Sequence, residues 1–539
     1  MNWLELDDPK QRTLGAALRR QAKEIPDTPF ILAGDTRYSY AAVDALANAW
    51  ASGLREAGVG QGDTVAIFME SCPEFVFAAF GANKLGAIWV PTNTDYKGEW
   101  LRAGFEDSRA RVLLTDAKLL PRIAELGDGL AFERIYVRGE AAEGLELCAP
   151  LLPLAELVHE GAEEPGGVEV VYGDTAAVLW TSGTTGRAKG VMQSHNAWIR
   201  AAQSGARSTG VQEGDILYSC LPMYNSAAWV TNIYRALVCG IPFGLDSHFS
   251  AQAFWDRCRH YGATMTFTLG AMHIFLWQAP RRDDDADNPI REASMIPMPA
   301  ELVGPFRERF GIDRIDQGYG QSEVMGIFAR ADDGTRSWKP NSLGEVVKGI
   351  ELTLLDDEDL PVATGEVGEF CVRPSEPHVI FNGYFNNSEA TLRSFSNLWY
   401  HTGDLGRCDE DGEYFFVDRK ADFIRFKGRN VSSFAVEASV AAHPAVAQAA
   451  AHGVVSEQLE HEAEIKICVV LEPGAKLTPE ELARFVNDNA PYFFVPRYIE
   501  FVDSLPQTPT GRVQKFKLRE RGVTSETWDG RVAGFALRR

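Results

Sequence analysis

The chain has 539 residues, of which 45% are apolar and 24% are charged. These values are typical of globular proteins, so they exclude intrinsic disorder and a collagen-like fold, and the length suggests about three to four domains of ~150 residues. The formal net charge is −22, from 53 Lys and Arg against 75 Asp and Glu. Such an acidic chain argues against general binding of nucleic acid or anionic membranes, so an anionic ligand would require a local concentration of positive charge.

The eight cysteines form no CxxC pair and no Cys/His cluster with the spacing of a zinc site. We therefore expect free thiols in a reducing compartment. The first ten residues, MNWLELDDPK, lack the basic and then apolar layout of a signal peptide. No uninterrupted apolar run reaches the ~18 residues of a membrane span, so we predict a cytoplasmic protein with neither a membrane nor a nucleic-acid partner.

Short apolar runs alternate with segments of helical period along most of the chain, which is typical of mostly parallel sheets covered by helices. The predicted strands are residues 64–69, 87–90, 111–115, 135–137, 176–180, 216–220 and 264–268, and the predicted helices are residues 73–85 and 251–260. The charged segment RRDDDADN at residues 281–288 is interpreted as a solvated loop.

The character of the sequence changes after about residue 341, where short strands and Gly/Asp turns indicate a smaller β-rich unit. Strands are predicted there at residues 351–355 and 366–372. The tail from residue 421 is a mixed α/β unit in which the Ala-rich residues 441–451 predict a helix.

The most informative segment is residues 181–190, TSGTTGRAKG, which follows the apolar run ending at Trp180. Its glycines allow a close approach of the backbone to a ligand, and its hydroxyls and Lys189 can contact phosphate oxygens. The pattern is neither a Walker A loop nor a Rossmann fingerprint. A plain surface turn is the alternative, which the composition and the apolar residues that follow disfavour.

This segment is similar to the phosphate-binding loop of the adenylate-forming superfamily, which contains acyl-CoA synthetases, nonribosomal peptide adenylation domains and beetle luciferases. The resemblance covers roughly residues 10–520, because further motif-like segments follow in the family's order. They are LPMYNS at 221–226, YGQSE at 319–323, YHTGD at 400–404, DRKAD at 418–422, FKGRNV at 426–431 and LPQTPTGR at 505–512. The wording FVDRK at 416–420 and VSSF at 431–434 resembles the carnitine-CoA-ligase-like group, and acyl-CoA ligases of platensimycin-type diterpenoid antibiotic pathways are a further resemblance.

The resemblance implies an α/β fold. A large N-terminal domain, residues 1–420, would consist of two α/β subdomains and a β-rich subdomain and would bind the adenylate and the acyl group. A small, mobile α+β C-terminal domain would comprise residues 421–539. The implied activity is that of an AMP-forming acid–thiol ligase, which uses ATP and Mg²⁺ to convert a carboxylic acid to acyl-AMP and then transfers the acyl group to CoA.

The resemblance also implies roles for single residues. Ser322 would contact the α-phosphate, Glu323 would bind Mg²⁺ through its carboxylate, and Tyr319 would stack on adenine. Asp404 would accept hydrogen bonds from both ribose hydroxyls, with Arg419 beside it. The β- and γ-phosphates would be held by the loop residues Thr181, Ser182, Gly183, Thr184, Thr185, Gly186 and Lys189.

The acyl group would be contacted by Gly318, Gly320, Asn225 and Trp229. Lys427 and Gly428 resemble the loop that lines the pantetheine tunnel, which favours CoA over a carrier protein. Aromatic and thioether side chains between the motifs would suit a large apolar acid, although most are expected to lie in the core. They are Trp198, Trp229, Phe267, Met272, Phe275 and Trp277.

The sequence departs from the family pattern at three positions. Asn225 stands where many relatives carry a histidine or an aromatic residue, so the pocket could be wider there, or the change could be neutral. Ala421 occupies the hinge position, which is usually Asp or Lys. Arg512 replaces the lysine that bridges the carboxylate and the α-phosphate during adenylation. Arginine keeps the charge but has a different shape, so we expect weakened adenylation, unless Lys515 or Lys517 substitutes or Arg512 itself suffices.

These departures suggest a ligase specialised for thioester formation from acyl-AMP that an upstream adenylating enzyme supplies. The alternatives are a full two-step ATP-dependent ligase, a standalone adenylation domain that loads a carrier protein, and a non-catalytic nucleotide-binding relative. Positive charge lies within the motifs, although the chain is acidic as a whole. The residues that carry it are Lys189, Arg419, Lys427, Arg429 and Arg512.

Overall fold

The computed structural model describes residues 1–181, 188–331, 334, 336–420, 422–426, 429–455, 463–507 and 513–537. Lys427, Gly428, Ala421, Arg512 and the loop residues 182–187 therefore lie outside the described part. The backbone divides into two compact units, of which the first comprises residues 1–181, 188–352 and 373–395 and the second comprises 353–372 and the described residues from 396 onward. No helix in the described ranges is long and apolar enough to cross a membrane.

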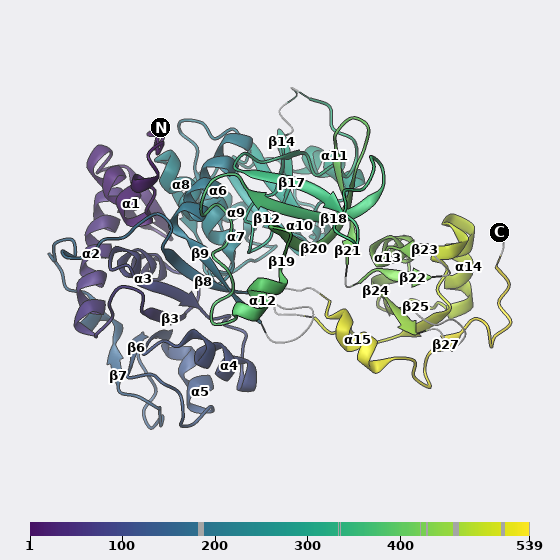
Figure 1. Ribbon diagram of the computed structural model, residues 1–539, viewed down its shortest axis with the longest axis horizontal. Coiled ribbons are helices and arrows are strands. Elements are labelled where there is room, and N and C mark those ends of the chain that lie inside the picture. Colours follow the sequence, from purple (N-terminus) through teal and green to yellow (C-terminus); the bar gives the residue numbers. More distant parts are fainter. Residues whose placement is uncertain are drawn as a thin grey trace. The chain divides into compact units, whose positions relative to one another are not determined.

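The first unit contains a seven-stranded sheet in the order β7-β6-β5-β3-β4-β8-β9 (Figure 1). Neighbouring strands are parallel from β7 to β8, and β9 runs antiparallel to β8. Both faces of this sheet are covered, as in β3, where every residue is buried. The strands are β3 (Thr64–Phe68), β4 (Ile88–Pro91), β5 (Val112–Asp116), β6 (Arg134–Arg138), β7 (Leu151–Pro153), β8 (Thr175–Thr181) and β9 (Lys189–Ser194).

A second, nine-stranded sheet of this unit has the order β16-β15-β14-β13-β12-β10-β11-β1-β2. Its centre, from β14 to β1, is parallel, and antiparallel strands close both edges. The strands are β1 (Pro29–Ala33), β2 (Thr36–Ser39), β10 (Leu217–Ser219), β11 (Phe243–Leu245), β12 (Met265–Leu269), β13 (Glu292–Ile296), β14 (Arg314–Tyr319), β15 (Phe328–Arg330) and β16 (Glu345–Val346).

Helices alternate with the strands in this unit, as the sequence predicts. Helix α3 begins with Pro73 in its first turn, where the missing N–H costs nothing, and most of its side chains are buried. The helices are α1 (Leu14–Glu24), α2 (Tyr40–Glu56), α3 (Pro73–Lys84), α4 (Gly98–Ser108), α5 (Leu120–Ala124), α6 (His195–Ser208), α7 (Ser226–Ala228), α8 (Tyr234–Cys239), α9 (Phe254–Tyr261), α10 (Ala271–Gln278), α11 (Ala300–Phe310) and α12 (Ser388–Arg393), with a π-helical turn at Trp229–Ile233.

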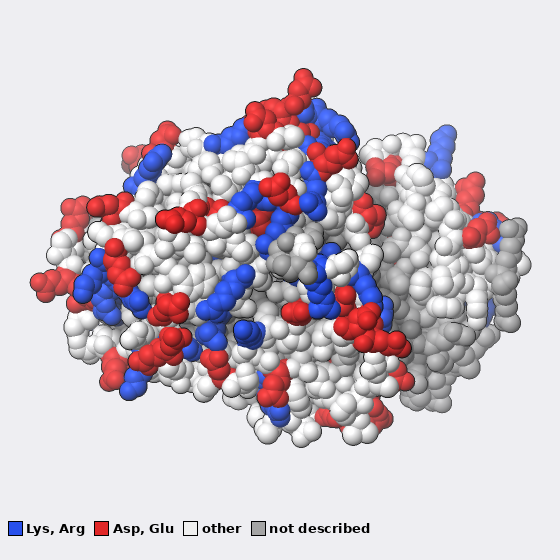
Figure 2. Space-filling view, turned by 90° about the horizontal axis from the view of Figure 1, so that it is seen from above, with Lys and Arg blue, Asp and Glu red and all other residues white. Residues whose placement is uncertain are grey.

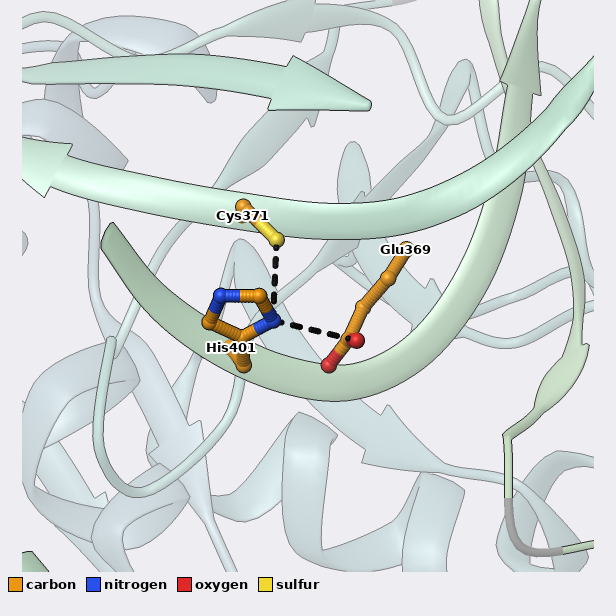
Figure 3. Close-up of side chains that lie close together, drawn as sticks. All are labelled: Glu369, Cys371 and His401. Carbon is orange, nitrogen blue, oxygen red and sulfur yellow. Dashed lines mark hydrogen bonds and ion pairs between the residues drawn. The ribbon is translucent and has the colours of Figure 1, made fainter. Parts of the chain in front are cut away.

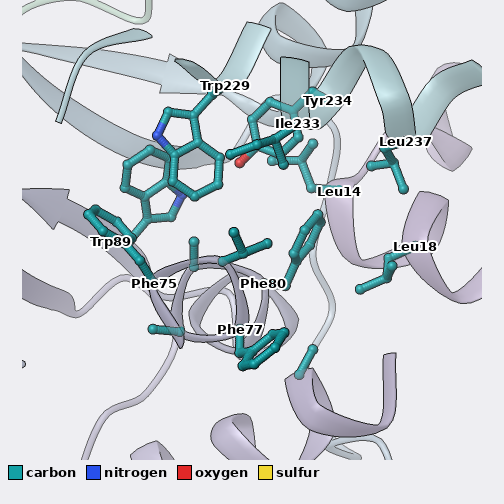
Figure 4. Close-up of a cluster of buried hydrophobic side chains, with 14 of the residues drawn as sticks. Leu14, Leu18, Phe75, Phe77, Phe80, Trp89, Trp229, Ile233, Tyr234 and Leu237 are labelled. Atoms are coloured by element: carbon teal, nitrogen blue, oxygen red, sulfur yellow. The ribbon is translucent and has the colours of Figure 1, made fainter. Parts of the chain in front are cut away.

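The main core of the first unit is aromatic. Figure 4 shows Trp89 and Trp229 packed against each other beside Phe75, with Tyr234 next to them. The Trp89 and Trp229 ring centroids lie 4.4 Å apart, and both side chains are fully buried. Large rings packed at such distances contribute strongly to core stability.

The second unit contains two main sheets. A five-stranded sheet has the order β17-β18-β20-β19, with β21 paired to β20, and β20 runs antiparallel to both β18 and β21. A four-stranded sheet has the order β24-β25-β26-β27. The strands are β17 (Ile350–Leu355), β18 (Val367–Pro374), β19 (Phe395–Ser396), β20 (Trp399–Cys408), β21 (Tyr414–Arg419), β24 (Val446–Val455), β25 (Ala463–Leu471), β26 (Tyr498–Phe501) and β27 (Trp528–Asp529). A β22 (Ile424–Phe426) and β23 (Arg429–Val431) hairpin and helices α13 (Ser433–Ala441), α14 (Pro479–Asn489) and α15 (Lys515–Arg521) complete it. The predicted α/β class with a β-rich part and a small C-terminal α+β part is confirmed.

The helix predicted at residues 441–451 is wrong. Helix α13 ends at Ala441, and residues Val446–Val455 form β24, the antiparallel partner of β25. Pro444 prevents the helix from continuing, since a proline disfavours helical backbone at the residue before it. The long pairing with β25 then outweighs the weak helix preference of the alanines.

All eight cysteines are free thiols. Six are buried, and Cys148 and Cys408 are partly exposed. Burial raises the pKa of Cys220 and of Cys239 to about 12, so these thiols are protonated at neutral pH.

Candidate functional site

Lys189, Glu323 and Tyr384 lie together in the first unit. Lys189 is the first residue of β9, and its ammonium group lies 4.8 Å from the centre of the Tyr384 ring. The Tyr384 hydroxyl donates a hydrogen bond of 2.9 Å to the Glu323 carboxylate, which is 9% exposed. The structure therefore brings together two predicted residues, the phosphate-binding lysine and the magnesium-binding glutamate, with a phenol between them.

Tyr384 is a site residue that the sequence motifs miss. Residues 381–385 run along β9: Asn382 N–H donates to Met192 O, Met192 N–H donates to Gly383 O, and Phe385 N–H donates to Gly190 O. This pairing places Tyr384 over Lys189. A tyrosine outside every motif carries no local signal, and the only hint is the aromatic wording FNGYF around a glycine.

The predicted residues Gly318, Tyr319, Gly320 and Ser322 lie at and beyond the end of β14. The carbonyl oxygen of Ser322 accepts a hydrogen bond from the Gln193 side chain, which ties this segment to β9. Gly320 lies in a tight turn, because an added Cβ would stand 2.7 Å from Met325 O. The same segment thus fixes Ser322 and the neighbouring Glu323 relative to the end of the phosphate-binding motif.

Thr181, the first residue of the 181–190 motif, ends β8 and is partly buried. Its hydroxyl donates to the backbone oxygen of Lys189 at 3.3 Å. The two ends of the motif are therefore held side by side on neighbouring strands. Ser182, Gly183, Thr184, Thr185 and Gly186 lie outside the described residues.

Asn225 and Trp229 differ in their accessibility. Asn225 is partly buried and immediately precedes α7. The Trp229 indole is fully buried in the aromatic core and donates a hydrogen bond of 2.7 Å to Met223 O. Trp229 thus supports the 221–226 segment from behind, and its expected contact with the acyl group stays a prediction.

Of the other four aromatic candidates for the acyl pocket, Trp198 and Phe267 are also buried and Trp277 is partly buried. Trp198 is fully buried and Phe267 nearly so, whereas the Phe275 side chain is 53% exposed. His273, in the same region, is held between the Thr268 hydroxyl and Pro297 O, and burial lowers the pKa of this histidine to about 4. A neutral His273 therefore has a structural role in this region.

In the second unit, Asp404 and Arg419 are cross-strand partners on β20 and β21. The Arg419 Nε atom lies 3.5 Å from Asp404 Oδ1, and Asp404 is buried. The structure thus brings together the two residues predicted to serve the ribose. On the neighbouring strand, Asp418 accepts hydrogen bonds from the N–H and the hydroxyl of Ser433 at the start of α13.

Glu369, Cys371 and His401 form a cluster on β18 and β20, as Figure 3 shows. Their ligand atoms all lie within 4.8 Å of one another, so these side-chain types could hold a divalent ion. The ammonium group of Lys420, however, lies 3.0 Å from Glu369 Oε2. A positive charge is thus already supplied to the carboxylate, and we interpret the cluster as a hydrogen-bond network.

Two lysines follow Arg512, and one of them is held by neighbours. Lys515 Nζ donates to Ser433 Oγ at 2.6 Å and lies 2.7 Å from Glu437 Oε1. Burial raises the pKa of Glu437, although Lys515 opposes this effect. Lys517 is exposed.

The drawn face of the surface carries both acidic and basic side chains (Figure 2). On the face drawn in Figure 2, acidic and basic side chains are interspersed, and the basic ones do not form a field over the whole face. Lys189, which the sequence predicts to contact phosphate, is a single residue at the start of β9, close to an aromatic ring and a carboxylate.

Residues 18–385 match the model of the AMP-binding enzyme family, and residues 435–512 match that of the AMP-binding enzyme C-terminal domain. The chain is 32% identical to a crotonobetaine/carnitine–CoA ligase of Salmonella paratyphi A over 493 residues, which cover 90% of this chain and 93% of the relative.

Solved structures are similar over nearly the whole chain. An anthranilate CoA ligase in complex with anthranoyl-AMP has a TM-score of 0.81 and 26% identity, covering 94% of this chain and 96% of its own. An o-succinylbenzoate CoA synthetase from Bacillus subtilis in complex with ATP and a magnesium ion has a TM-score of 0.80 and 25% identity, covering 93% of this chain and 98% of its own.

Proposed function

Because the chain belongs to the AMP-binding enzyme family and is an AMP-forming acyl-CoA ligase that works through an acyl-adenylate, we propose that it is specialised for the second half of this reaction. In that half, the thiol of CoA attacks the carbonyl carbon of acyl-AMP, the thioester forms and AMP leaves. The acyl-AMP would come from an upstream adenylating enzyme in the cytoplasm, and the C-terminal domain would begin at residue 421, with Ala421 as the hinge.

The observation that carries this proposal is Arg512 at the position of the adenylating lysine. Arginine is a planar cation with a different reach from a compact ammonium, so a contact made in the adenylation transition state would weaken selectively. The engagement of Lys515 with Glu437 and Ser433 supports this reading, because that lysine is already committed to other partners.

The residues of the first unit fit ATP and Mg²⁺. Glu323 would hold Mg²⁺ and Lys189 the β- and γ-phosphates, and the Tyr384 hydroxyl already orients the Glu323 carboxylate. Bound ATP would supply the α-phosphate to which the acid is joined. Ser322 would contact that phosphate and Tyr319 would stack on adenine, and the resemblance assigns the ribose to Asp404 and Arg419 of the second unit.

The acyl group and CoA would occupy the remaining predicted positions. Asn225, Gly318 and Gly320 would border the acyl group, with Trp229 supporting that wall from the core. Lys427 and Gly428 would line the path of the pantetheine arm. A partly buried asparagine in the 221–226 segment leaves more room than an aromatic side chain, which suits a bulky acid.

The test compares the two half-reactions with crotonobetaine and anthranilate as probe acids. Purified protein receives either the free acid, Mg-ATP and CoA, or the synthetic adenylate and CoA. We expect thioester formation from the adenylate to be at least about tenfold faster than from the free acid, a difference of ~1.4 kcal/mol in barrier height. Brisk pyrophosphate release with the free acid would contradict the proposal and favour a full two-step ligase.

The matched variants are Arg512→Lys and Arg531→Lys, which make the same change inside and outside the motif. Arg512→Lys should raise ATP-dependent pyrophosphate release about tenfold, and transfer from the adenylate should stay within about twofold. Arg531→Lys should change neither rate. If Arg512→Lys leaves pyrophosphate release unchanged, position 512 is not the cause of weak adenylation.

A further inference from the structure

The segment that carries Asp404 is a kink in β20. Glu369 of β18 is opposite Leu405, and two residues further along β18 Cys371 is opposite His401. On the β18 side, the three residues 402–404 are therefore opposite the single residue Phe370. Gly403 adopts a left-handed φ of 74°, a conformation that favours glycine. Such bulges re-aim a side chain at the edge of a site. The direction of the Asp404 carboxylate therefore depends on what fixes the Gly403 peptide group.

Glu369 holds the backbone N–H of Gly403. Its Oε1 atom accepts a hydrogen bond of 2.8 Å from Gly403 N–H, and its side chain is buried. On the other side, Gly403 O accepts a hydrogen bond of 2.8 Å from the backbone N–H of Lys420. The carboxylate and the Lys420 backbone thus clamp the residue that precedes Asp404.

The second oxygen of Glu369 reaches toward the predicted hinge. Oε2 lies 3.0 Å from Lys420 Nζ and 3.1 Å from His401 Nδ1. The Lys420 ammonium group also lies 3.0 Å from the Asp357 carboxylate. Burial lowers the pKa of Lys420, but the hydrogen bonds to Asp357 and Glu369 have the larger combined effect, so the pKa is raised. Lys420 is the last residue before position 421.

We propose that Glu369 is a positioning residue that fixes the ribose-binding carboxylate of Asp404 and links it to Lys420 at the hinge. This inference rests on the proposed role of Asp404. One carboxylate oxygen holds the bulge and the other holds the lysine, and a glutamine cannot replace both because it has a single acceptor oxygen. Its oxygen would turn to Lys420, and its NH₂ group would face the N–H of Gly403.

The test measures discrimination by the ribose hydroxyls. Dissociation constants for AMP and for 2′,3′-dideoxyadenosine monophosphate are determined by calorimetry for wild type, Asp404→Asn, Glu369→Gln and the double variant. Hydrogen bonds to a charged group predict that wild type binds AMP at least about tenfold more tightly than the dideoxy compound. Glu369→Gln should reduce this ratio at least about fivefold and leave dideoxy-AMP binding within about twofold.

If Glu369 acts through the Asp404 carboxylate, Glu369→Gln should have no further effect once Asp404 is replaced. The ratio of the two dissociation constants in the double variant should therefore be no lower than in Asp404→Asn alone. Glu500→Gln is the matched control, because Glu500 is another buried carboxylate of the same unit that is paired with a lysine. In this control the ratio of the two dissociation constants should equal that of wild type. If Glu369→Gln keeps the wild-type ratio, or weakens both nucleotides equally, the inference is overturned.

A second variant keeps the test valid if Glu369→Gln fails to fold. Glu369→Asp keeps the charge opposite Lys420 but is shorter by about 1.5 Å, so its carboxylate withdraws from Gly403. It should lose the same discrimination, and a wild-type ratio in this variant would overturn the inference. If wild type itself does not discriminate, or if Asp404→Asn retains the ratio, the proposed ribose site fails, and this inference fails with it.

Discussion

Two lysine–glutamate pairs of the second unit differ in what else their carboxylates hold. Glu500 on β26 is fully buried with Lys466, and its other partners are Thr527 and Arg521. Glu369 is equally well buried, but it keeps one oxygen for Gly403 N–H beside Asp404. The Glu500 carboxylate therefore stabilises a buried part of the core, whereas the Glu369 carboxylate contacts the segment that carries Asp404. The partners of a buried charge thus indicate its role better than its burial does.

Breaking the core pair should have the largest effect. Glu500→Gln leaves the Lys466 ammonium buried without a counter-charge, so we expect the free energy of unfolding to fall by about 3 kcal/mol. Hydrogen–deuterium exchange in β24–β26, with urea titrations, measures this loss. A destabilisation as small as that of an exposed ion pair would show that this comparison is wrong.

Acid should cause the next largest loss of stability, and it should act through His452, which lies beside the core pair of Lys466 and Glu500. His452 is the cross-strand partner of Lys466, and burial, with a smaller contribution from Lys466, lowers the pKa of His452 to about 4. The unfolded chain takes up this proton near pH 6.5 and the folded chain only near pH 4, so stability is lost as the pH falls through that window. At ~1.36 kcal/mol per pH unit, the loss from pH 6.5 to 5 is about 2 kcal/mol.

His452→Gln should remove that part of the pH dependence, because glutamine does not titrate. Urea titrations at both pH values, for wild type and for the variant, check this expectation. An equal loss of stability in both proteins would assign the acid sensitivity to other groups. His195 is the control for a buried histidine that lies far from the core pair in the sequence. Burial lowers its pKa to about 3, and it belongs to the first unit.

The smallest change in stability is expected at the site pair. Lys420 is 43% exposed as a side chain, so Lys420→Met should cost less than about 1 kcal/mol of unfolding free energy. The same variant should weaken AMP binding, because the Glu369 carboxylate loses a partner that orients it. Calorimetry measures AMP binding and urea titration measures the free energy of unfolding, so the two effects can be separated. A large loss of stability with unchanged AMP binding would show that Lys420–Glu369 behaves like the core pair Lys466–Glu500.

The sequence predicts the layered part of the fold well, because its strands are uniformly apolar and its helices have clear starts. Residues 64–69 and 73–85 lie on β3 and α3 within one residue at each end. The Ala-rich residues 441–451 are mispredicted because alanine is a helix former only while neighbouring strands do not compete for its backbone.

The site is predicted where a motif carries the chemistry and missed where tertiary pairing does. Lys189 and Glu323 stand in motifs, and the structure brings them together. Tyr384 and Glu369 lie outside every motif, and their contacts with the predicted site residues form only when residues 381–385 pair with β9 and when β18 pairs with β20. No local pattern contains this information, since the partners are far apart along the chain.

The free cysteines have a practical consequence for observing motion in this enzyme. Six of the eight thiols are buried, so replacing Cys148 and Cys408 would leave a chain in which maleimide dyes attach mainly at cysteines introduced on purpose. A dye pair on exposed positions before and after residue 421 would then test by energy transfer whether the predicted C-terminal domain moves when AMP, ATP or CoA is added. Such a labelled chain would test the predicted hinge during each half-reaction in single molecules.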